Sequence, residues 1–163
     1  MSDDVFEIRP IGTIRSEHTV AKNTPIQPVF AKSCSGTVEV FPDYEEGLDD
    51  LDGFSHIYLL YRFDQSSQYK LKVKPFLQDV ERGVFSTRAP SRPNQIGMSI
   101  VRLIRREGTT LFVEGLDILD GTPLLDIKPY ISRFDGIQTD RNGWQEEVSD
   151  PEAERLGKRG FDS

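Results

Sequence analysis

Six short segments rich in β-branched and aromatic residues constrain the fold of this chain more than any other feature of its sequence. Gly, Pro or Asp residues bound each segment, as is typical of strands that end in turns. No long stretch with a helical period lies between them, which argues against a doubly wound α/β sheet. We therefore predict a mainly β fold, a single compact β-barrel domain with short helical insertions. The segments are FEIRPIGTIRS at 6–16, GTVEVF at 36–41, HIYLLYRF at 56–63, MSIVRLIRR at 98–106, TLFVEGLDI at 110–118 and LLDIKPYI at 124–131.

Two local patterns refine this prediction. Tyr44–Leu51 is expected to form a short helix, with Asp43 as its N-cap and acidic residues in its first turn. Ile57–Phe63 is almost continuously apolar, so we expect that strand to be covered on both faces.

The apolar density falls after residue 135, so we expect a barrel domain over 5–135 and a C-terminal arm over 136–163. Asp150-Pro151 followed by EAERL predicts a short helix in the arm, with Pro at its first position. Three alternatives remain open for this arm. It packs back through Trp144 and Phe161, it reaches a partner subunit, or it is largely mobile.

Charge is distributed unevenly along the chain. The net charge is −7, yet residues 62–106 contain ten Lys or Arg against three acidic residues. This segment favours a basic face that could meet phosphate. The alternative is that Lys70, Lys72 and Lys74 are solvated loop charges and that some cations pair with the acidic region Glu39–Asp52.

The sequence also limits compartment and metal chemistry. The single cysteine, Cys34, excludes an internal disulfide and a cysteine-based zinc cage, and we expect no metal. No apolar run has the length of a membrane span, and the acidic start MSDDVFEIRP has no apolar core of a secretory signal. A cytoplasmic protein without membrane contact is expected.

Several catalytic motifs are missing from the sequence: the dinucleotide-binding G-x-G-x-x-G, the P-loop, H-E-x-x-H and G-x-S-x-G. His56 lies within an apolar strand, where a hydrogen-bonded core histidine is expected. Cys34 has no base near it in the sequence, which argues against a nucleophile.

The stretch GVFSTRAPSRPNQIG at 83–97 contains two arginines and no acidic residue. Pro90 and Pro93 restrict its backbone, so Arg88 and Arg92 would lose little entropy on binding a ligand. Gly97 would allow close backbone approach or a positive φ. The alternative is an ordered turn whose arginines bond backbone carbonyls.

Residues 115–130, GLDILDGTPLLDIKPY, contain a predicted turn followed by an extended segment. Strand alternation would put Asp126, Lys128 and Tyr130 on one face. An acid, an ammonium and a phenol side by side indicate a functional edge. A plain Asp–Lys surface pair is the alternative.

Five blocks together resemble the TsaA-like, or TrmO, family, in the order of that family. They are IGTIRS at 11–16, PIQP at 25–28, LDGFSHIYLLYRF at 51–63, GVFSTRAPSRPNQIGMS at 83–99 and GLDILDGTPLLDIKPY at 115–130. The resemblance implies an S-adenosylmethionine-binding β-barrel, usually a homodimer, that methylates N6 of threonylcarbamoyladenosine next to the anticodon of tRNA. The family usually has His, Ser and Pro where this chain has Asp64, Ala89 and Gln95.

The resemblance also implies positions for the cofactor, which would lie among residues from four parts of the chain. These are Pro25, Ile26, Gln27, Asp64, Gln65, Arg88, Met98, Ile118, Leu119, Asp120 and Gly121.

The chemistry of methyl transfer suggests roles for the remaining candidates. Asp126 is the candidate proton acceptor, and Lys128 and Tyr130 would orient the substrate. The anticodon-loop phosphates would be contacted by Arg92, Lys70, Lys72 and Lys74. Two alternatives stay open: a methyltransferase of the same fold with a different small-molecule or RNA substrate, and a module that binds S-adenosylmethionine without catalysis.

Overall fold

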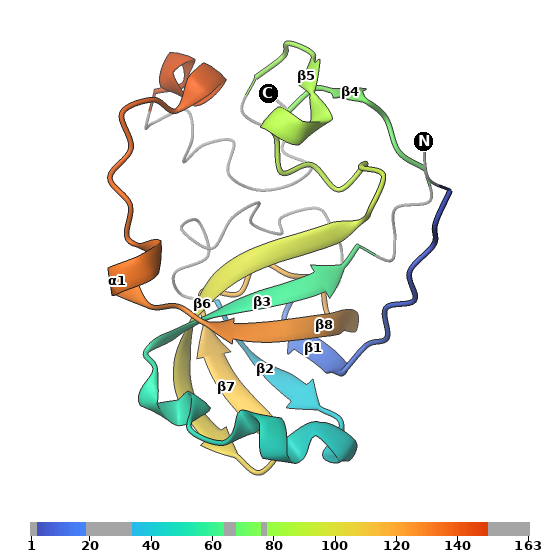
Figure 1. Ribbon diagram of the computed structural model, residues 1–163. Coiled ribbons are helices and arrows are strands. Elements are labelled where there is room, and N and C mark those ends of the chain that lie inside the picture. Colours follow the sequence, from blue (N-terminus) through green and yellow to red (C-terminus); the bar gives the residue numbers. More distant parts are fainter. Residues whose placement is uncertain (1–2, 19–33, 64–67, 76–77, 150–163) are drawn as a thin grey trace.

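The computed structural model describes residues 3–18, 34–63, 68–75 and 78–149, and its centre is a closed antiparallel barrel with the strand order β1-β2-β7-β6-β3-β8 (Figure 1). The barrel closes because β1 pairs with β8, and Gly12 lies opposite Leu124. The prediction of a mainly β barrel is confirmed. The barrel strands are β1 (Gly12–Ser16), β2 (Ser35–Val40), β3 (His56–Arg62), β6 (Ile96–Glu107), β7 (Thr110–Glu114) and β8 (Thr122–Pro129).

The core lies inside the barrel and follows the alternation of its strands. Along β3 the buried side chains are Ile57, Leu59 and Tyr61, at every second position. Aliphatic residues from the other strands complete this core, among them Ile14, Val38, Val101, Leu111, Val113 and Leu124.

Two sequence expectations about the lower part of the barrel need correction. Only residues 12–16 of the segment 6–16 form a strand, β1. Gly12 lies opposite Val40, the last residue of β2, so residues before Gly12 have no strand partner in β2. The helix expected at Tyr44–Leu51 is instead a 3-10 helix over Pro42–Leu48, labelled η2, followed by η3 at Leu51–Gly53.

Asp43 is not the N-cap of η2. The N-cap is Phe41, which makes no side-chain cap bond, because Pro42 occupies the first turn and the helix begins two residues earlier than expected. Leu48 is the buried residue of η2, so one apolar side chain anchors this polar segment to the barrel.

An insertion between β3 and β6 forms a small lobe above the barrel in Figure 1. We call the described residues between 68 and 95 the insertion lobe. It contains the two-stranded sheet of β4 (Lys72–Val73) and β5 (Arg82–Gly83) and the 3-10 turn η4 (Val84–Ser86). Val73 and Val84 are its buried aliphatic residues.

After β8 the chain forms α1 (Ser132–Asp135) and then runs up the side of the molecule to η5 (Gly143–Glu147), beside the insertion lobe (Figure 1). The helix predicted after Asp150 lies outside the described residues. Within the part of the chain that the structure describes, no helix is long and apolar enough to cross a membrane.

Candidate functional site

Three neighbouring strands bring two groups of predicted site residues onto one outer face of the barrel. In β3, Leu60 pairs with Met98 of β6 on one side and with Asp126 of β8 on the other. Because adjacent strands lie about 4.8 Å apart, the backbones of Met98 and Asp126 are about 10 Å apart. The next row puts Lys128 beside Tyr58. We call this surface the β6–β3–β8 face.

Asp126 and Lys128 form an ion pair on this face. The carboxylate Oδ2 of Asp126 lies 3.4 Å from Nζ of Lys128, and half or more of each side chain is exposed. The other oxygen, Oδ1, accepts a hydrogen bond of 2.9 Å from the amide of Ile127. The predicted alternation is therefore confirmed for these two residues. An exposed pair of this kind also agrees with the alternative of a plain surface pair.

Tyr130 lies just beyond the end of β8 and joins an aromatic group. Its amide donates to the carbonyl of His56, and its ring centroid is 5.8 Å from that of Tyr58 and 6.4 Å from that of His56. Burial, followed by the negative charge of Asp135 on α1, raises the pKa of Tyr58 above its usual value, so its phenol stays protonated at neutral pH.

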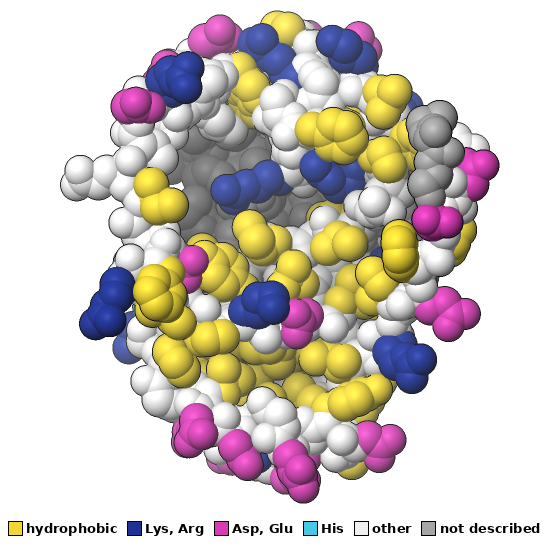
Figure 2. Space-filling model, in the orientation of Figure 1, with side chains coloured by type: hydrophobic (Ala, Val, Ile, Leu, Met, Phe, Trp, Pro, Cys, Tyr) yellow, Lys and Arg dark blue, Asp and Glu magenta, His cyan; other side chains and the backbone are white. Residues whose placement is uncertain are grey.

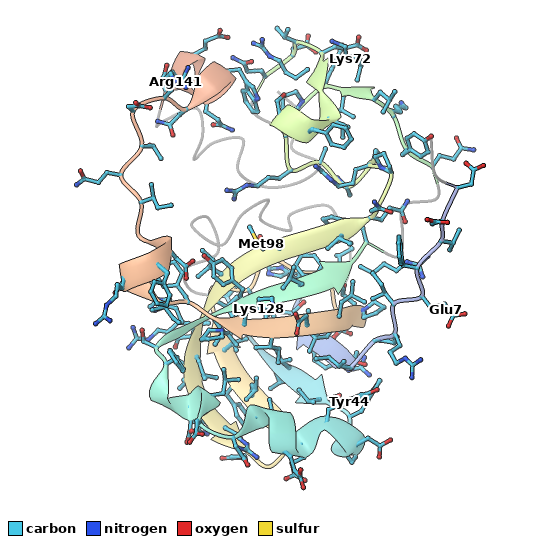
Figure 3. The ribbon with its side chains drawn as sticks, viewed as in Figure 1. Glu7, Tyr44, Lys72, Met98, Lys128 and Arg141 are labelled. Carbon is cyan, nitrogen blue, oxygen red and sulfur yellow. The ribbon has the colours of Figure 1, made fainter. Side chains whose placement is uncertain are left out.

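The outer side of β3 is not covered as the sequence suggested. Ile57, Leu59 and Tyr61 are buried, but the alternate residues are only half-buried, including Tyr58 and Leu60. Met98 beside them is 48% exposed. In Figure 3 Met98 lies on β6 at the upper side of the barrel, and Lys128 lies on the front of β8.

His56 is likewise not a core histidine. It is half-buried on the outer side of β3, with Nδ1 2.8 Å from Oγ of Ser55. Neither His56 nor Tyr58 was predicted from the sequence as a member of this face. Their alternation with Ile57 and Leu59 was the signal that could have identified them.

The turn expected at residues 120–123 is confirmed at Asp120 and Gly121, whereas Thr122 and Pro123 already belong to β8. Hydrogen bonds attach this turn to the end of β1. Gly121 has a φ of +83°, which favours glycine, and its amide donates to Ile14. Ser16 donates through Oγ to the carbonyl of Ile118 at 2.6 Å, and its amide donates to Oδ1 of Asp120 at 3.1 Å. The carbonyl of Leu119 accepts a bond of 2.7 Å from Thr122 Oγ1.

A buried hydrogen-bond chain links this turn to β3 and β6. Tyr61 donates its phenol proton to Ser99 at 3.0 Å, because Ser99 in turn donates to Oδ1 of Asp117 at 2.7 Å. All three side chains are at least nine-tenths buried. Met98 precedes Ser99, and Ile118 follows Asp117. The hydrogen bonds therefore fix the candidate cofactor residues Met98 and Ile118 relative to each other.

Five other predicted cofactor residues, Pro25, Ile26, Gln27, Asp64 and Gln65, lie outside the described residues. The turn at 118–121 contacts His18, the last described residue before the segment that contains Pro25, Ile26 and Gln27. The amide of Asp120 donates to the carbonyl of His18.

Arg88 and Arg92, the two arginines of the stretch 83–97, differ in their surroundings. Arg92 is half-buried, and its Nη1 donates to the carbonyls of Thr87 at 3.1 Å and Ala89 at 2.9 Å. Arg92 therefore matches the alternative expectation, an ordered turn in which the arginine bonds backbone carbonyls. Arg88 is exposed. Figure 2 shows Lys or Arg side chains within the hollow between the barrel and the insertion lobe.

The positive segment 62–106 does not form one continuous face. Lys74 pairs with Asp79 at 3.1 Å in the insertion lobe, and Lys72 lies at the outer end of that lobe (Figure 3). At the other end of the barrel Arg106 pairs with Asp49 at 3.3 Å. The expected pairing with the acidic region 39–52 is confirmed at this position.

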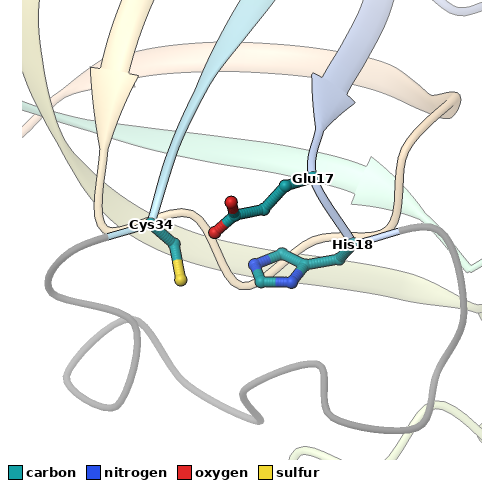
Figure 4. Close-up of side chains that lie close together, drawn as sticks. All are labelled: Glu17, His18 and Cys34. Atoms are coloured by element: carbon teal, nitrogen blue, oxygen red, sulfur yellow. The ribbon is translucent and has the colours of Figure 1, made fainter.

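Cys34 has neighbours that its sequence surroundings did not reveal. Glu17, His18 and Cys34 converge where β1 ends and β2 begins, and their ligand atoms lie within 4.8 Å of one another (Figure 4). The expectation that Cys34 lacks a nearby base was therefore wrong. His18 Nε2 donates to the carbonyl of Leu116 at 2.8 Å. The trio offers the oxygen, nitrogen and sulfur ligands that suit zinc.

Comparison with known proteins agrees with this architecture. A probable S-adenosyl-L-methionine-binding protein of Pyrococcus abyssi is 52% identical over 138 residues, which cover 85% of this chain and 75% of that protein. The human tRNA (adenine(37)-N6)-methyltransferase is 37% identical over 136 residues, 79% of this chain. This chain spans only 31% of the human enzyme's length.

A crystal structure of TrmO from Pseudomonas aeruginosa superimposes with a TM-score of 0.72 at 41% sequence identity, covering 86% of this chain and 62% of that one. The model of the tRNA-methyltransferase O N-terminal domain matches residues 13–136, which include all of the barrel strands except Gly12, the first residue of β1. This chain therefore belongs to the family of the tRNA-methyltransferase O N-terminal domain.

Proposed function

We propose that this protein binds S-adenosyl-L-methionine beside the β6–β3–β8 face and methylates N6 of threonylcarbamoyladenosine next to the anticodon of tRNA. The observation that carries the proposal is the cross-strand row of Met98, Leu60 and Asp126, which joins a candidate cofactor residue to a candidate base. The names of relatives with the same barrel support the choice of reaction.

The surroundings of Met98 suit the cofactor. Met98 and Ile96 leave apolar surface exposed on β6, and the nearby turn Ile118–Gly121 offers backbone groups in a fixed arrangement. The methyl group on the cofactor's sulfonium supplies the group to be transferred. The cofactor would be held by Pro25, Ile26, Gln27, Asp64, Gln65, Arg88, Met98, Ile118, Leu119, Asp120 and Gly121.

Asp126 would accept the proton that the exocyclic nitrogen of the substrate loses. The ammonium of Lys128 lies 3.4 Å from this carboxylate, close enough to hold it in place for that role. Tyr130 and Tyr58 offer ring faces on which a splayed-out base can stack. The two tyrosines would thus orient the base while Asp126 takes its proton.

The RNA backbone would be contacted from the insertion lobe. Arg92, Lys70, Lys72 and Lys74 are the candidate phosphate contacts, and Lys72 is in an exposed position on β4. We also propose a homodimer in the cytoplasm. The partly exposed apolar side chains of β6 are consistent with a surface that a partner or a ligand covers.

Incubation with labelled S-adenosyl-L-methionine and total tRNA, followed by nucleoside analysis, tests the proposal. We expect label in N6-methylated threonylcarbamoyladenosine. Label in a different nucleoside would overturn the proposed target while keeping the methyltransferase.

A module that binds the cofactor without catalysis is the second candidate. The relative from Pyrococcus abyssi, three-quarters of which aligns with this chain, is named a binding protein. Calorimetric binding of S-adenosyl-L-methionine without transfer to any RNA pool would support this second candidate and contradict the first.

A further inference from the structure

The C-terminal segment is fastened to the insertion lobe by side chains of η5. Trp144 donates through Nε1 to the carbonyl of Ser86 at 2.8 Å. Oε2 of Glu147 accepts bonds from Arg82 Nη2 at 2.9 Å and from Gln78 Nε2 at 3.0 Å. Arg82 also donates to Oε1 of Gln78 at 2.8 Å, which closes a triangle of three side chains.

These contacts act on the part of the lobe that presents the arginines. Ser86 is the last residue of η4, and Thr87, whose carbonyl accepts from Arg92, follows directly. Val73 and Val84 are the buried aliphatic side chains among the described residues of the lobe. The polar contacts from η5 therefore add to the restraint on the lobe's position.

The path of the C-terminal segment explains how it reaches the lobe. From α1 on the barrel the chain runs up the side of the molecule to η5, beside the insertion lobe (Figure 1). Figure 2 shows a hollow between the barrel and the lobe. The contact between η5 and the lobe therefore ties the lobe to the segment that leaves the barrel after β8.

We propose that Trp144 and Glu147 are positioning residues, which hold the Arg88–Arg92 loop at a fixed height above the β6–β3–β8 face. The inference rests on the proposed function, because the substrate that spans this distance would be an RNA whose phosphates meet the lobe while its base lies on the barrel. Neither residue needs to touch the substrate. Their effect passes through Ser86 and Arg82 to the loop.

Amide hydrogen exchange tests the fastening without any reaction. In Trp144→Phe and in Glu147→Gln, we expect lobe amides to exchange about fivefold faster than in the wild type, the size of one hydrogen bond or exposed ion pair. Barrel amides of β6 and β7 should keep their rates. Unchanged exchange of the lobe in both variants would overturn the proposal.

Methyl-transfer kinetics then test the positioning role. We expect the KM for tRNA to rise about fivefold in each variant, with kcat unchanged when both tRNA and S-adenosyl-L-methionine are saturating. Asp140→Asn is the matched control, because it removes the same charge from the same segment at a side chain 97% exposed. An equal rise of KM in Asp140→Asn would show that the loss of one negative charge alone raises KM, and it would overturn the positioning role.

The two measurements separate the inference from the function on which it rests. If wild-type protein methylates no RNA, the proposed function fails, and faster lobe exchange in the variants still supports the fastening. If the wild type is active and the variants keep its KM for tRNA, the positioning role fails and the proposed function stands.

Discussion

At the scale of single residues, Asp126 is the group whose replacement discriminates best between catalysis and binding. Asp126→Asn keeps the shape of the side chain but removes its proton-accepting charge. We expect kcat for methylation of tRNA to fall by about 10²–10⁴-fold, the usual contribution of a general base. Calorimetry should give an unchanged affinity for S-adenosyl-L-methionine.

Glu107→Gln is the control for this substitution. Glu107 pairs with Arg105 at 3.0 Å, an exposed pair like that of Asp126 and Lys128, but it lies at the far end of β6. Its replacement should leave kcat at the wild-type value. Full turnover by Asp126→Asn would refute the assignment of Asp126 as the base.

Glu147 makes the contact between η5 and the lobe dependent on pH. The hydrogen bond from Gln78, followed by the positive charge of Arg82, holds the pKa of Glu147 below its ordinary value of 4.5. Its stabilising contribution is therefore complete above pH 4.5 and is lost as the pH falls through the lower pKa of the folded state.

The measurement is the thermal midpoint of wild type and Glu147→Gln across this acid range. We expect the wild type to be the more stable protein at neutral pH and the two curves to converge on acidification. A difference that stays constant with pH would show that the carboxylate charge of Glu147 does not contribute to the contact.

At the scale of elements, the pairing of β3 with β6 depends on close approach at Gly97. Gly97 lies opposite Tyr61, and a Cβ at this position would collide with the Tyr61 ring and lie 2.8 Å from Cζ of Phe63. Gly97→Ala should lower the free energy of unfolding by about 1–3 kcal/mol, because the buried ring must shift and its bond to Ser99 weakens. Urea denaturation measures the change.

Gly83→Ala is the matched control, since a Cβ there has no atom within 4 Å and Gly83 has an ordinary φ of −59°. This variant should keep the wild-type stability within about 0.5 kcal/mol. Equal stability of Gly97→Ala and wild type would mean that Tyr61 can move at little cost.

The same elements explain how much of the structure could be predicted. Strand composition identified the barrel, and alternation within β8 put Asp126 and Lys128 on one face. Met98 joins them only because β3 lies between β6 and β8, an order that depends on long-range pairing and not on local sequence. Cys34 lies close to Glu17 and His18 for a similar reason. The pairing of β1 with β2, in which Ser16 lies opposite Gly36, brings these residues together.

At the scale of the whole molecule, the charge distribution limits how strongly RNA can be held. The net charge is −7. Some cations of the positive segment 62–106 form ion pairs on the barrel, and Arg106, which pairs with Asp49, is one of them. In the lobe Lys74 is paired with Asp79, and Arg92 bonds carbonyls of its own loop. Of the four candidate phosphate contacts, we therefore count Lys70 and Lys72 as available for phosphate among the described residues of the lobe.

Two phosphate contacts predict a shallow dependence of tRNA affinity on salt, a slope of log K against log salt of about −1.4 for a single-stranded loop. Lys72→Gln should make this slope about 0.7 less steep, because one contact is lost. Arg106→Gln removes the same charge at the opposite end of the barrel and should leave the slope unchanged. Fluorescence anisotropy with labelled tRNA measures all three slopes, and equal slopes for both variants would mean that the insertion lobe does not contact the RNA backbone through Lys72.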